Sequence, residues 1–240
     1  MKSWQQRGSI WQLCPQQPAA VIEFIGGSYL AATPQVSYRR LLEQFSQLNL
    51  AVHAWSYVPG FDHQAQARQA WSDFRTARIA LNERIGTAPV TFRIGHSLGC
   101  KLHLLAPDGG RRSQAFVALS FNNFNAERSI PLLSEIAPRL GVVTEFSPSP
   151  AETLRLIQQH YIQPRNLVVR FGDDALDQSQ ELFQALASRA HDSSELTQLP
   201  GDHLTPASAG MRQGLFGDWA DDPAKSRRYR RLAELIVRWC

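Results

Sequence analysis

The sequence predicts an α/β fold in which a mainly parallel sheet is covered by helices on both faces. Short apolar runs of about five to nine residues alternate along the chain with longer stretches whose apolar residues recur at helical spacing. Parallel strands need crossover helices between them, and these helices cover the sheet. The chain has 240 residues, of which 43% are hydrophobic and 19% charged. We therefore expect a single domain over residues 1–240.

The expected strands are apolar runs that end at turn-forming residues. They span residues 19–25, 49–57, 90–94, 115–121, 166–171 and 195–199, and residues 9–15 predict an antiparallel edge strand. One helix is expected from Pro34 to Leu48, because Thr33 can cap it and proline suits the first helical position. A second is expected from Asp62 to Ile85, and others after residue 97, after residue 178 and at the C-terminus.

Residues 122–163 form a longer connection than a single crossover helix requires. The stretch is rich in proline and contains several leucine and isoleucine residues. We interpret it as a small helical cap, inserted over the edge of the sheet where the carboxyl ends of the strands lie. Parallel α/β sheets bind their ligands at that edge.

A serine between two glycines follows the strand at residues 90–94. The segment Gly95-His96-Ser97-Leu98-Gly99 matches the G-x-S-x-G pattern of a nucleophile elbow, a sharp strand-to-helix turn. Small residues two positions before and after the serine let such a turn close. The pattern therefore predicts an exposed nucleophile, and the N–H of Leu98 is expected to donate to an oxyanion.

A nucleophilic serine needs a base and an orienting acid. His203 is the expected base, because it alone among the seven histidines combines a strand end with a Gly-Asp-His turn. Three aspartates follow residues 166–171. We favour Asp174 as the acid, with apolar Leu176 anchoring its loop. Asp177 is the alternative, although Gln180 makes it suitable for a helix-capping box, and Asp173 comes third.

The loop after the strand at residues 19–25 is expected to supply a second oxyanion donor. It contains Gly26 and Gly27, followed by Ser28. Paired glycines let backbone N–H groups approach a developing oxyanion without intervening side chains. We expect the N–H of Gly27 or Ser28 to act with that of Leu98.

Other function classes find little support in the sequence. It contains no phosphate-binding or dinucleotide-binding glycine motif and no metal-ligand spacing, so we expect neither a cofactor nor a metal. Three widely spaced cysteines and the lack of an apolar leader favour a soluble, cytoplasmic protein. The net charge is +4. We expect no nucleic-acid partner. A basic cluster near the C-terminus is interpreted as a solvated helix face that is open to weak contact with an anionic surface, and it consists of Arg227, Arg228, Arg230 and Arg231.

These motifs together resemble the α/β-hydrolase superfamily. More narrowly, several segments are similar to the DUF1350 family of cyanobacteria and plastids, which has no assigned reaction: EFIGGSYLAATPQVSYRRLLEQF, GHSLGCKLHLL, SFNNFNAERSIP, FGDDALDQS and LPGDHLTP. The resemblance implies an α/β-hydrolase fold with Ser97 as nucleophile, His203 as base and Asp174 as acid. The Gly26-Gly27-Ser28 loop lacks the leading histidine of the lipase HGGG motif.

The sequence thus predicts a serine hydrolase that forms an acyl-enzyme from an ester, thioester or similar acyl substrate. An acyltransferase would use the same triad with an alcohol or thiol in place of water. A non-catalytic binding or assembly factor with this fold is the alternative from another class, because fold alone does not determine function.

Overall fold

The computed structural model describes residues 3–126, 145–207 and 223–240. Within these ranges eight strands form one sheet in the order β1-β2-β4-β3-β5-β6-β7-β8. They are β1 (Gln5–Arg7), β2 (Ile10–Leu13), β3 (Ala20–Ile25), β4 (Leu50–Trp55), β5 (Val90–His96), β6 (Ala115–Leu119), β7 (Asn166–Phe171) and β8 (Glu195–Leu199). Strands β3 to β8 pair in parallel, and β2 pairs antiparallel with both β4 and β1. The predicted N-terminal strand therefore exists, but β1 forms the edge.

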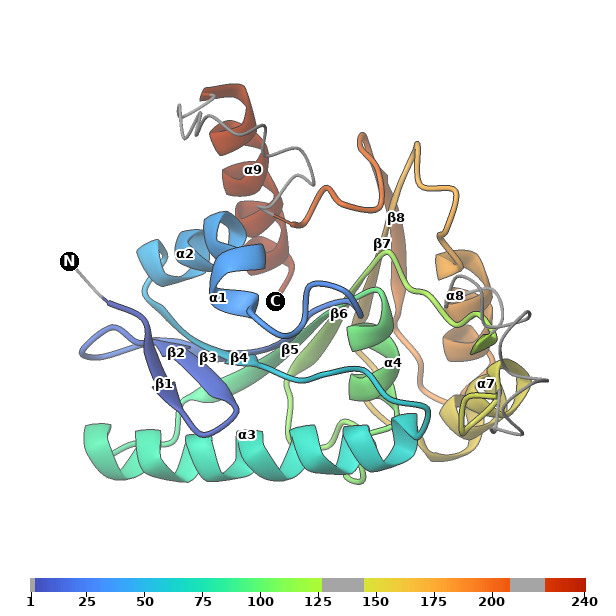
Figure 1. Ribbon diagram of the computed structural model, residues 1–240, viewed down its shortest axis with the longest axis horizontal. Coiled ribbons are helices and arrows are strands. Elements are labelled where there is room, and N and C mark those ends of the chain that lie inside the picture. Colours follow the sequence, from blue (N-terminus) through green and yellow to red (C-terminus); the bar gives the residue numbers. More distant parts are fainter. Residues whose placement is uncertain (1–2, 127–144, 208–222) are drawn as a thin grey trace, which may run out of the picture.

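Helices cover both faces of the sheet (Figure 1). One face carries α1 (Pro34–Ser37), α2 (Arg39–Gln47) and α9 (Pro223–Trp239), and the other carries α3 (His63–Ile85), α4 (Leu98–Leu104) and α8 (Ser179–Ala187). A further helix, α7 (Pro150–His160), lies beside α8. The layered arrangement predicted from the alternation of strands and helices is thus confirmed.

The two layers of core follow directly from these faces. On the α2 and α9 side, Phe24, Phe45, Val52 and Ile236 belong to one buried cluster that also includes β5, β6 and β7. On the other side, residues of α3 and α4 form a second cluster, and α4, α7 and α8 contribute to a third. Strands β3, β4 and β6 are buried along their whole length, which explains their continuous apolar runs.

Both ends of α3 have clear local causes, and so does the interruption of another predicted helix. The Asp62 carboxylate accepts a hydrogen bond from the N–H of Ala65 and caps α3, and Gly86 ends that helix in a left-handed conformation with φ of 71°. The single helix predicted from Pro34 to Leu48 is instead divided into α1 and α2. Tyr38 interrupts it with φ of −120° and is fully buried.

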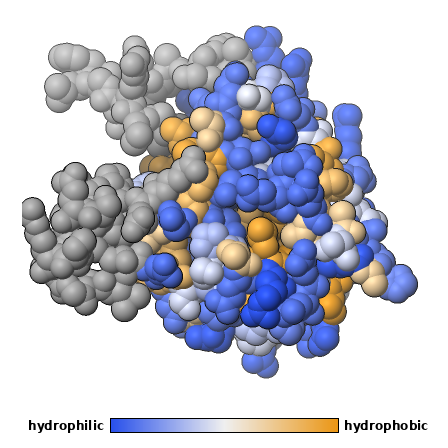
Figure 2. Space-filling model, turned by 90° about the vertical axis from the view of Figure 1, so that its right-hand side faces the viewer, coloured by the Kyte–Doolittle hydropathy of each residue, from blue (hydrophilic) through white to orange (hydrophobic). Residues whose placement is uncertain are grey.

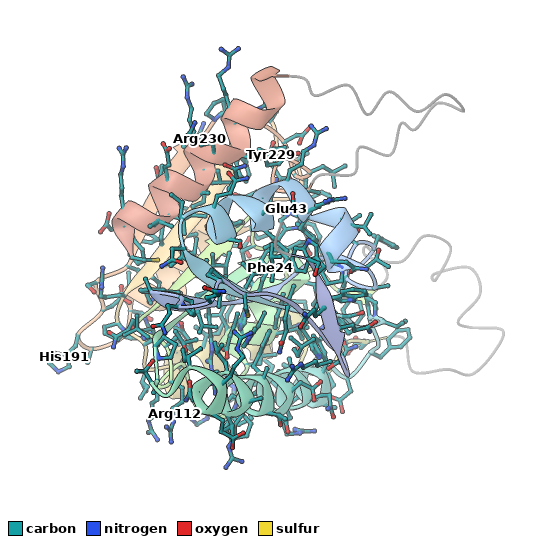
Figure 3. The ribbon with its side chains drawn as sticks, turned by 90° about the vertical axis from the view of Figure 1, so that its left-hand side faces the viewer. Phe24, Glu43, Arg112, His191, Tyr229 and Arg230 are labelled. Atoms are coloured by element: carbon teal, nitrogen blue, oxygen red, sulfur yellow. The ribbon has the colours of Figure 1, made fainter. Side chains whose placement is uncertain are left out.

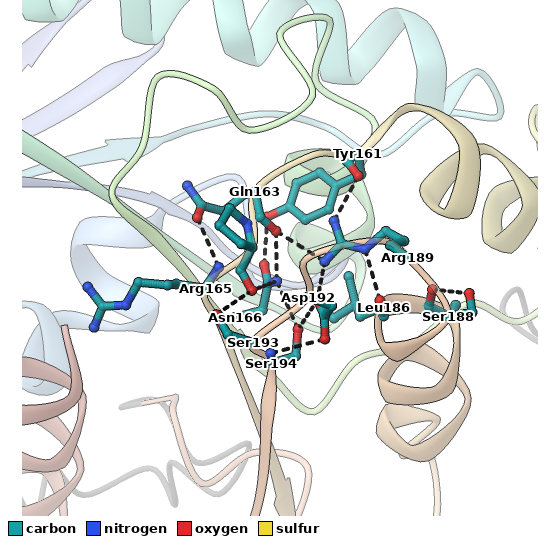
Figure 4. Close-up of polar contacts among 12 residues, drawn as sticks. Tyr161, Gln163, Arg165, Asn166, Leu186, Ser188, Arg189, Asp192, Ser193 and Ser194 are labelled. Carbon is teal, nitrogen blue, oxygen red and sulfur yellow. Dashed lines mark hydrogen bonds and ion pairs between the residues drawn. The ribbon is translucent and has the colours of Figure 1, made fainter.

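The predicted cap at 122–163 lies partly outside the described residues, since 127–144 are not among them. The cap stays a prediction. Within the described part, α7 buries Ile157 against α4 and α8. Arg189, just after α8, donates to the carbonyl oxygens of Tyr161 and Gln163 and pairs with Asp192 (Figure 4). These contacts fix the chain that runs from α7 into β7.

A buried ion network ties the centre of the sheet to α3. Glu23 on β3 is fully buried and lies opposite Arg93 on β5. The Glu23 carboxylate accepts hydrogen bonds from Arg78 of α3 and from Nε of Arg93, the latter at 3.3 Å. Arg93 also donates two hydrogen bonds to Asp108, at 2.9 and 2.8 Å. Pairing of this kind lets charged groups remain inside a core.

The outer surface is mixed in character. On the side of α7 and α8, apolar residues form separate patches on a mainly hydrophilic surface (Figure 2). Arg230 points outward from α9, whereas the buried Tyr229 lies on the side that faces α2 (Figure 3). Arg227, Arg228 and Arg231 are also exposed, so the basic cluster occupies an accessible face and its contact with an anionic surface stays a prediction. Among the described helices, none is both long and apolar enough to cross a membrane.

Candidate active site

The carboxyl ends of four parallel strands bring the candidate residues together. Ser97 follows β5, Asp174 follows β7, His203 follows β8, and the Gly26–Ser28 loop follows β3. Because parallel strands end at the same edge of a sheet, residues far apart in the sequence meet there. The sequence prediction rested on this argument.

Ser97 occupies a sharp turn between β5 and α4. Its backbone has φ of 54° and ψ of −122°, a conformation that residues with side chains rarely adopt. A Cβ on Gly95 would lie 2.6 Å from the backbone of Cys100, and one on Gly99 would overlap the carbonyl oxygen of Ile25. Both glycines of the elbow are therefore required by close backbone contacts, as the pattern suggested.

The structure brings Ser97, His203 and Asp174 into one chain of hydrogen-bonding distances. Nε2 of His203 lies 3.1 Å from Oγ of Ser97, and Nδ1 lies 2.8 Å from Oδ2 of Asp174. An ionised carboxylate only accepts, so Nδ1 carries the proton and Nε2 is free to accept from the serine hydroxyl. The Asp174 side chain is fully buried and that of His203 is 18% exposed.

The choice among the three loop aspartates has a geometric answer. Besides His203, Asp174 accepts from the N–H of Leu176 at 2.8 Å, so that N–H orients its second oxygen. The Leu176 side chain is 44% exposed, and the expectation that it anchors the loop by apolar packing is wrong. Asp177 instead accepts from the Ser179 hydroxyl and pairs with Arg170. Asp173 is exposed.

The predicted capping box at Asp177 does not form. Helix α8 begins at Ser179 with Gln178 as its N-cap residue, and the Gln178 side chain does not cap it; the Asp177 carboxylate accepts from the hydroxyl and the N–H of Ser179. The Gln178 amide oxygen accepts from the N–H of Asn123, which ties α8 to the segment after β6. Burial raises the pKa of Asp177. The residue is therefore part of local packing beside the candidate site.

One expected oxyanion donor is already engaged. The N–H of Gly27 donates to the Tyr38 hydroxyl at 2.8 Å, so its assignment as a donor to substrate is corrected. Gly27 is nevertheless close to the nucleophile, since a Cβ there would lie 3.0 Å from Cβ of Ser97. No hydrogen bond among the described residues uses the N–H of Ser28 or Leu98. These two remain the candidate donors.

A second pair of buried side chains connects the elbow to both neighbouring loops. The Tyr38 hydroxyl lies 2.8 Å from Nδ1 of His96, and Nε2 of His96 lies 2.8 Å from the carbonyl oxygen of His203. Burial lowers the pKa of His96 to about 3. The neutral ring therefore donates from Nε2 to the carbonyl and accepts from Tyr38 at Nδ1.

Sequence reasoning missed this pair. Tyr38 lies within the single helix predicted from Pro34 to Leu48, and His96 occupies a variable position of the G-x-S-x-G pattern, so neither was among the predicted site residues. The break between α1 and α2 that turns Tyr38 inward has no helix-breaking residue to reveal it. The only available indication was an aromatic hydroxyl at a core position, which usually finds a partner when buried.

A cavity of about 280 Å³ adjoins the two candidate oxyanion donors. Ser28 and Leu98 form part of its wall, and Phe61, Phe124 and Phe146 supply aromatic surface. It also includes polar residues, among them His63 and Lys101. A mainly apolar cavity with a few polar groups is typical of a small-molecule site.

The described residues were also considered as possible metal ligands and disulfide partners. They contain no group of three or more His, Cys, Asp or Glu side chains arranged to hold a metal ion. All three cysteines, Cys14, Cys100 and Cys240, are free thiols.

Solved structures of lipases and esterases share the architecture. A soluble variant of monoglyceride lipase from Saccharomyces cerevisiae has a TM-score of 0.65 and 12% identity, covering 100% of this chain and 95% of its own. Monoacylglycerol lipase from Paleococcus ferrophilus has a TM-score of 0.61 and 12% identity, with 96% and 99% covered. FphF, a fluorophosphonate-binding serine hydrolase of Staphylococcus aureus, has a TM-score of 0.58 and 17% identity, covering 99% of this chain and 97% of its own. The chain has the α/β-hydrolase fold.

The sequence itself matches a family model. Residues 3–220 match the family described as protein of unknown function DUF1350, and the chain belongs to this family. Among curated proteins, none matches the chain. The resemblance to the DUF1350 family stated from the motifs is thus confirmed, and so is the predicted α/β-hydrolase fold.

Proposed function

We propose that the protein is a serine hydrolase acting on an ester, thioester or related acyl substrate. The observation that carries the proposal is the position of His203, with one ring nitrogen 3.1 Å from Oγ of Ser97 and the other 2.8 Å from Asp174. A base between a hydroxyl and a buried carboxylate can take the proton of the hydroxyl, and the carboxylate stabilises the resulting imidazolium.

In the first half of the reaction, Oγ of Ser97 attacks the carbonyl carbon while Nε2 of His203 takes its proton. The tetrahedral intermediate carries a negative oxygen that the N–H groups of Ser28 and Leu98 stabilise. His203 then gives its proton to the leaving alcohol or thiol. The acyl group remains on Ser97 as an ester, and Asp174 keeps the imidazole in the required tautomer throughout.

In the second half, water attacks the acyl-enzyme while His203 again acts as the base. Collapse of the second intermediate returns the proton to Ser97 and releases the carboxylic acid. An alcohol or thiol in the place of water would give transfer instead of hydrolysis. The apolar part of the cavity, with Phe61, Phe124 and Phe146, supports an acyl group that is partly hydrophobic.

The names of several structural neighbours, monoacylglycerol lipase and esterase among them, agree with acyl chemistry. The experiment is steady-state hydrolysis of short p-nitrophenyl esters and acyl thioesters by the full chain and by Ser97→Ala. We expect turnover that is lost in the variant, whose folding is checked by circular dichroism. Turnover that rises with added alcohol or thiol would favour an acyltransferase. A folded protein without turnover would favour a non-catalytic binding factor.

A further inference from the structure

Lys101 lies in the wall of the cavity beside the candidate oxyanion donors. It follows Leu98 by three positions on α4, and residues at this spacing lie on the same side of a helix. Both residues contribute to the cavity wall. Lys101 is 1% exposed, which is rare for a lysine without an ion-pair partner.

The charge of Lys101 has little compensation among the residues that the structure describes. Within them, its Nζ donates a single hydrogen bond, to the carbonyl oxygen of Pro148 at 3.0 Å. No carboxylate among the described residues forms an ion pair with it; Glu152 acts on it only from a distance. Burial lowers the pKa of Lys101 to about 7, and the charge of Lys101 contributes to the lowered pKa of His63 in the same cavity wall. An ammonium group can donate three hydrogen bonds, so two donors of Lys101 are available to a ligand.

Two further residues of the same cavity have buried side-chain atoms without partners. Among the described residues, no group forms a hydrogen bond with either ring nitrogen of His63 or with Oδ1 of Asn123, although Nδ2 of Asn123 donates to the carbonyl oxygen of Pro150. His63 is 2% exposed and Asn123 is 3% exposed. Buried polar groups usually find partners, and a cluster of exceptions around one cavity indicates a polar group of a ligand.

We propose that this cavity binds an acyl group whose far end carries a carboxylate, and that the carboxylate pairs with the ammonium of Lys101. The proposal rests on the proposed function, because the acyl carbonyl must lie between Ser97 and the N–H groups of Ser28 and Leu98. The apolar wall accommodates the methylene chain. One lysine balances one negative charge, which favours a carboxylate over a phosphate with its larger charge.

The size of the cavity fits such a group. A volume of about 280 Å³ has room for roughly nine water-sized groups. A short dicarboxylic half-ester therefore suits it better than a long lipid chain. Lys101 also distinguishes this cavity from a purely apolar acyl pocket, in which a buried cation would only add a desolvation cost.

The experiment compares two matched esters, p-nitrophenyl hydrogen glutarate and p-nitrophenyl pentanoate, by their kcat/KM values. The proteins are the full chain, Lys101→Met, which keeps the approximate length of the side chain, and Arg228→Met, which removes an exposed positive charge from α9 on the opposite side of the sheet. We expect the full chain and Arg228→Met to prefer the glutarate ester. In Lys101→Met this preference falls by about tenfold or more.

A binding measurement separates this inference from the proposed function. Glutarate is expected to raise the Tm of Ser97→Ala protein more than pentanoate does, and Lys101→Met in that background removes the difference. The same result without any ester turnover would keep the carboxylate site and reject the hydrolase. An equal preference in the full chain and Lys101→Met, or equal effects of glutarate and pentanoate on Tm, would overturn the inference. If Lys101→Met does not fold, the comparison of the Tm shifts that glutarate and pentanoate cause in Ser97→Ala still tests the inference.

Discussion

The Tyr38 hydroxyl lies 2.8 Å from Nδ1 of His96, and this contact joins the loop after β3 to the candidate base. Tyr38 accepts from the N–H of Gly27 on one side, and His96 donates to the carbonyl oxygen of His203 on the other. Both side chains are buried. Neither side chain forms a hydrogen bond with Oγ of Ser97 or with a ring nitrogen of His203, and the His96 ring packs against the His203 ring, so the pair positions the candidate base.

Tyr38→Phe removes one hydroxyl from this chain and leaves the Gly27 N–H and His96 Nδ1 without partners. Because unpaired buried groups cost about 1–3 kcal/mol each, we expect a lower Tm and a kcat about tenfold lower with little change in KM. Kinetics on a p-nitrophenyl ester and thermal unfolding measure both effects.

Tyr161→Phe is the matched control for this variant. Tyr161 is equally buried and its hydroxyl donates to Asn166 at 2.9 Å, away from the candidate site. It should lower Tm and leave kcat unchanged. Equal kcat values in the two variants would show that Tyr38 has only a structural role.

Asp174→Asn tests the assignment of the acid. The amide cannot hold His203 in the tautomer that accepts the Ser97 proton, so kcat should fall about a thousandfold or more while the fold is retained. Asp177→Asn is the comparison, because its carboxylate contacts Ser179 and Arg170 instead. A larger loss of kcat in Asp177→Asn than in Asp174→Asn would reverse the assignment.

Acid should destabilise the protein through its buried histidines. Burial lowers the pKa of His53 to about 3, whereas the unfolded chain titrates near 6.5. Between these values the unfolded state binds the extra proton, so stability is complete above pH 6.5 and is lost as pH falls toward 3. The loss is about 1.4 kcal/mol per pH unit for one such group, or about 2 kcal/mol at pH 5.

Urea unfolding of the full chain and of His53→Gln at pH 7 and pH 5 measures this contribution. The variant should lose about 2 kcal/mol less on acidification than the full chain does. The same loss in both proteins would mean that His53 does not stay neutral in the folded state.

Arg93→Met tests the buried ion network. The substitution leaves Asp108 without its cation and Glu23 with Arg78 alone, and breaking a buried pair costs about 3–5 kcal/mol. Arg39→Met removes an exposed arginine that pairs with Glu43 four residues on, which is worth about 0.5 kcal/mol. Urea unfolding compares the two. Similar losses in both variants would contradict a special role for the network.

Much of the fold could be predicted because the central parallel strands have short apolar runs that end at turns, whereas the exposed edge strand β1, of sequence QQR, has no apolar run and was not predicted. The strand at 166–171 matches β7 in both of its bounds. The break at Tyr38 could not be predicted, since residues 34–48 have uninterrupted helical spacing. Burial of the tyrosine hydroxyl beside His96 outweighs the preference for one long helix, and this contact depends on a residue 58 positions away.

Order along the chain and strand ends were enough to select Ser97 and His203. The acid was harder to select from the sequence, because which of the three neighbouring aspartates points toward His203 depends on the local direction of the backbone. The N–H of Leu176 orients Asp174, and no sequence pattern encodes that contact. The choice of oxyanion donor between Gly27 and Ser28 could not be made from the sequence either. The Tyr38 hydroxyl accepts from the N–H of Gly27, and the position of Tyr38 was not predicted.

The most direct test of the account is intact-protein mass spectrometry after treatment with a fluorophosphonate, followed by peptide mapping. We expect one adduct, on Ser97, that is absent from Ser97→Ala. Ser120→Ala should be labelled like the full chain, because Ser120 shares the positive φ, at 49°, but no described residue forms a hydrogen bond with its hydroxyl. A well-folded full chain without an adduct, or an adduct that persists in Ser97→Ala, would contradict the claim that His203 and Asp174 activate Ser97.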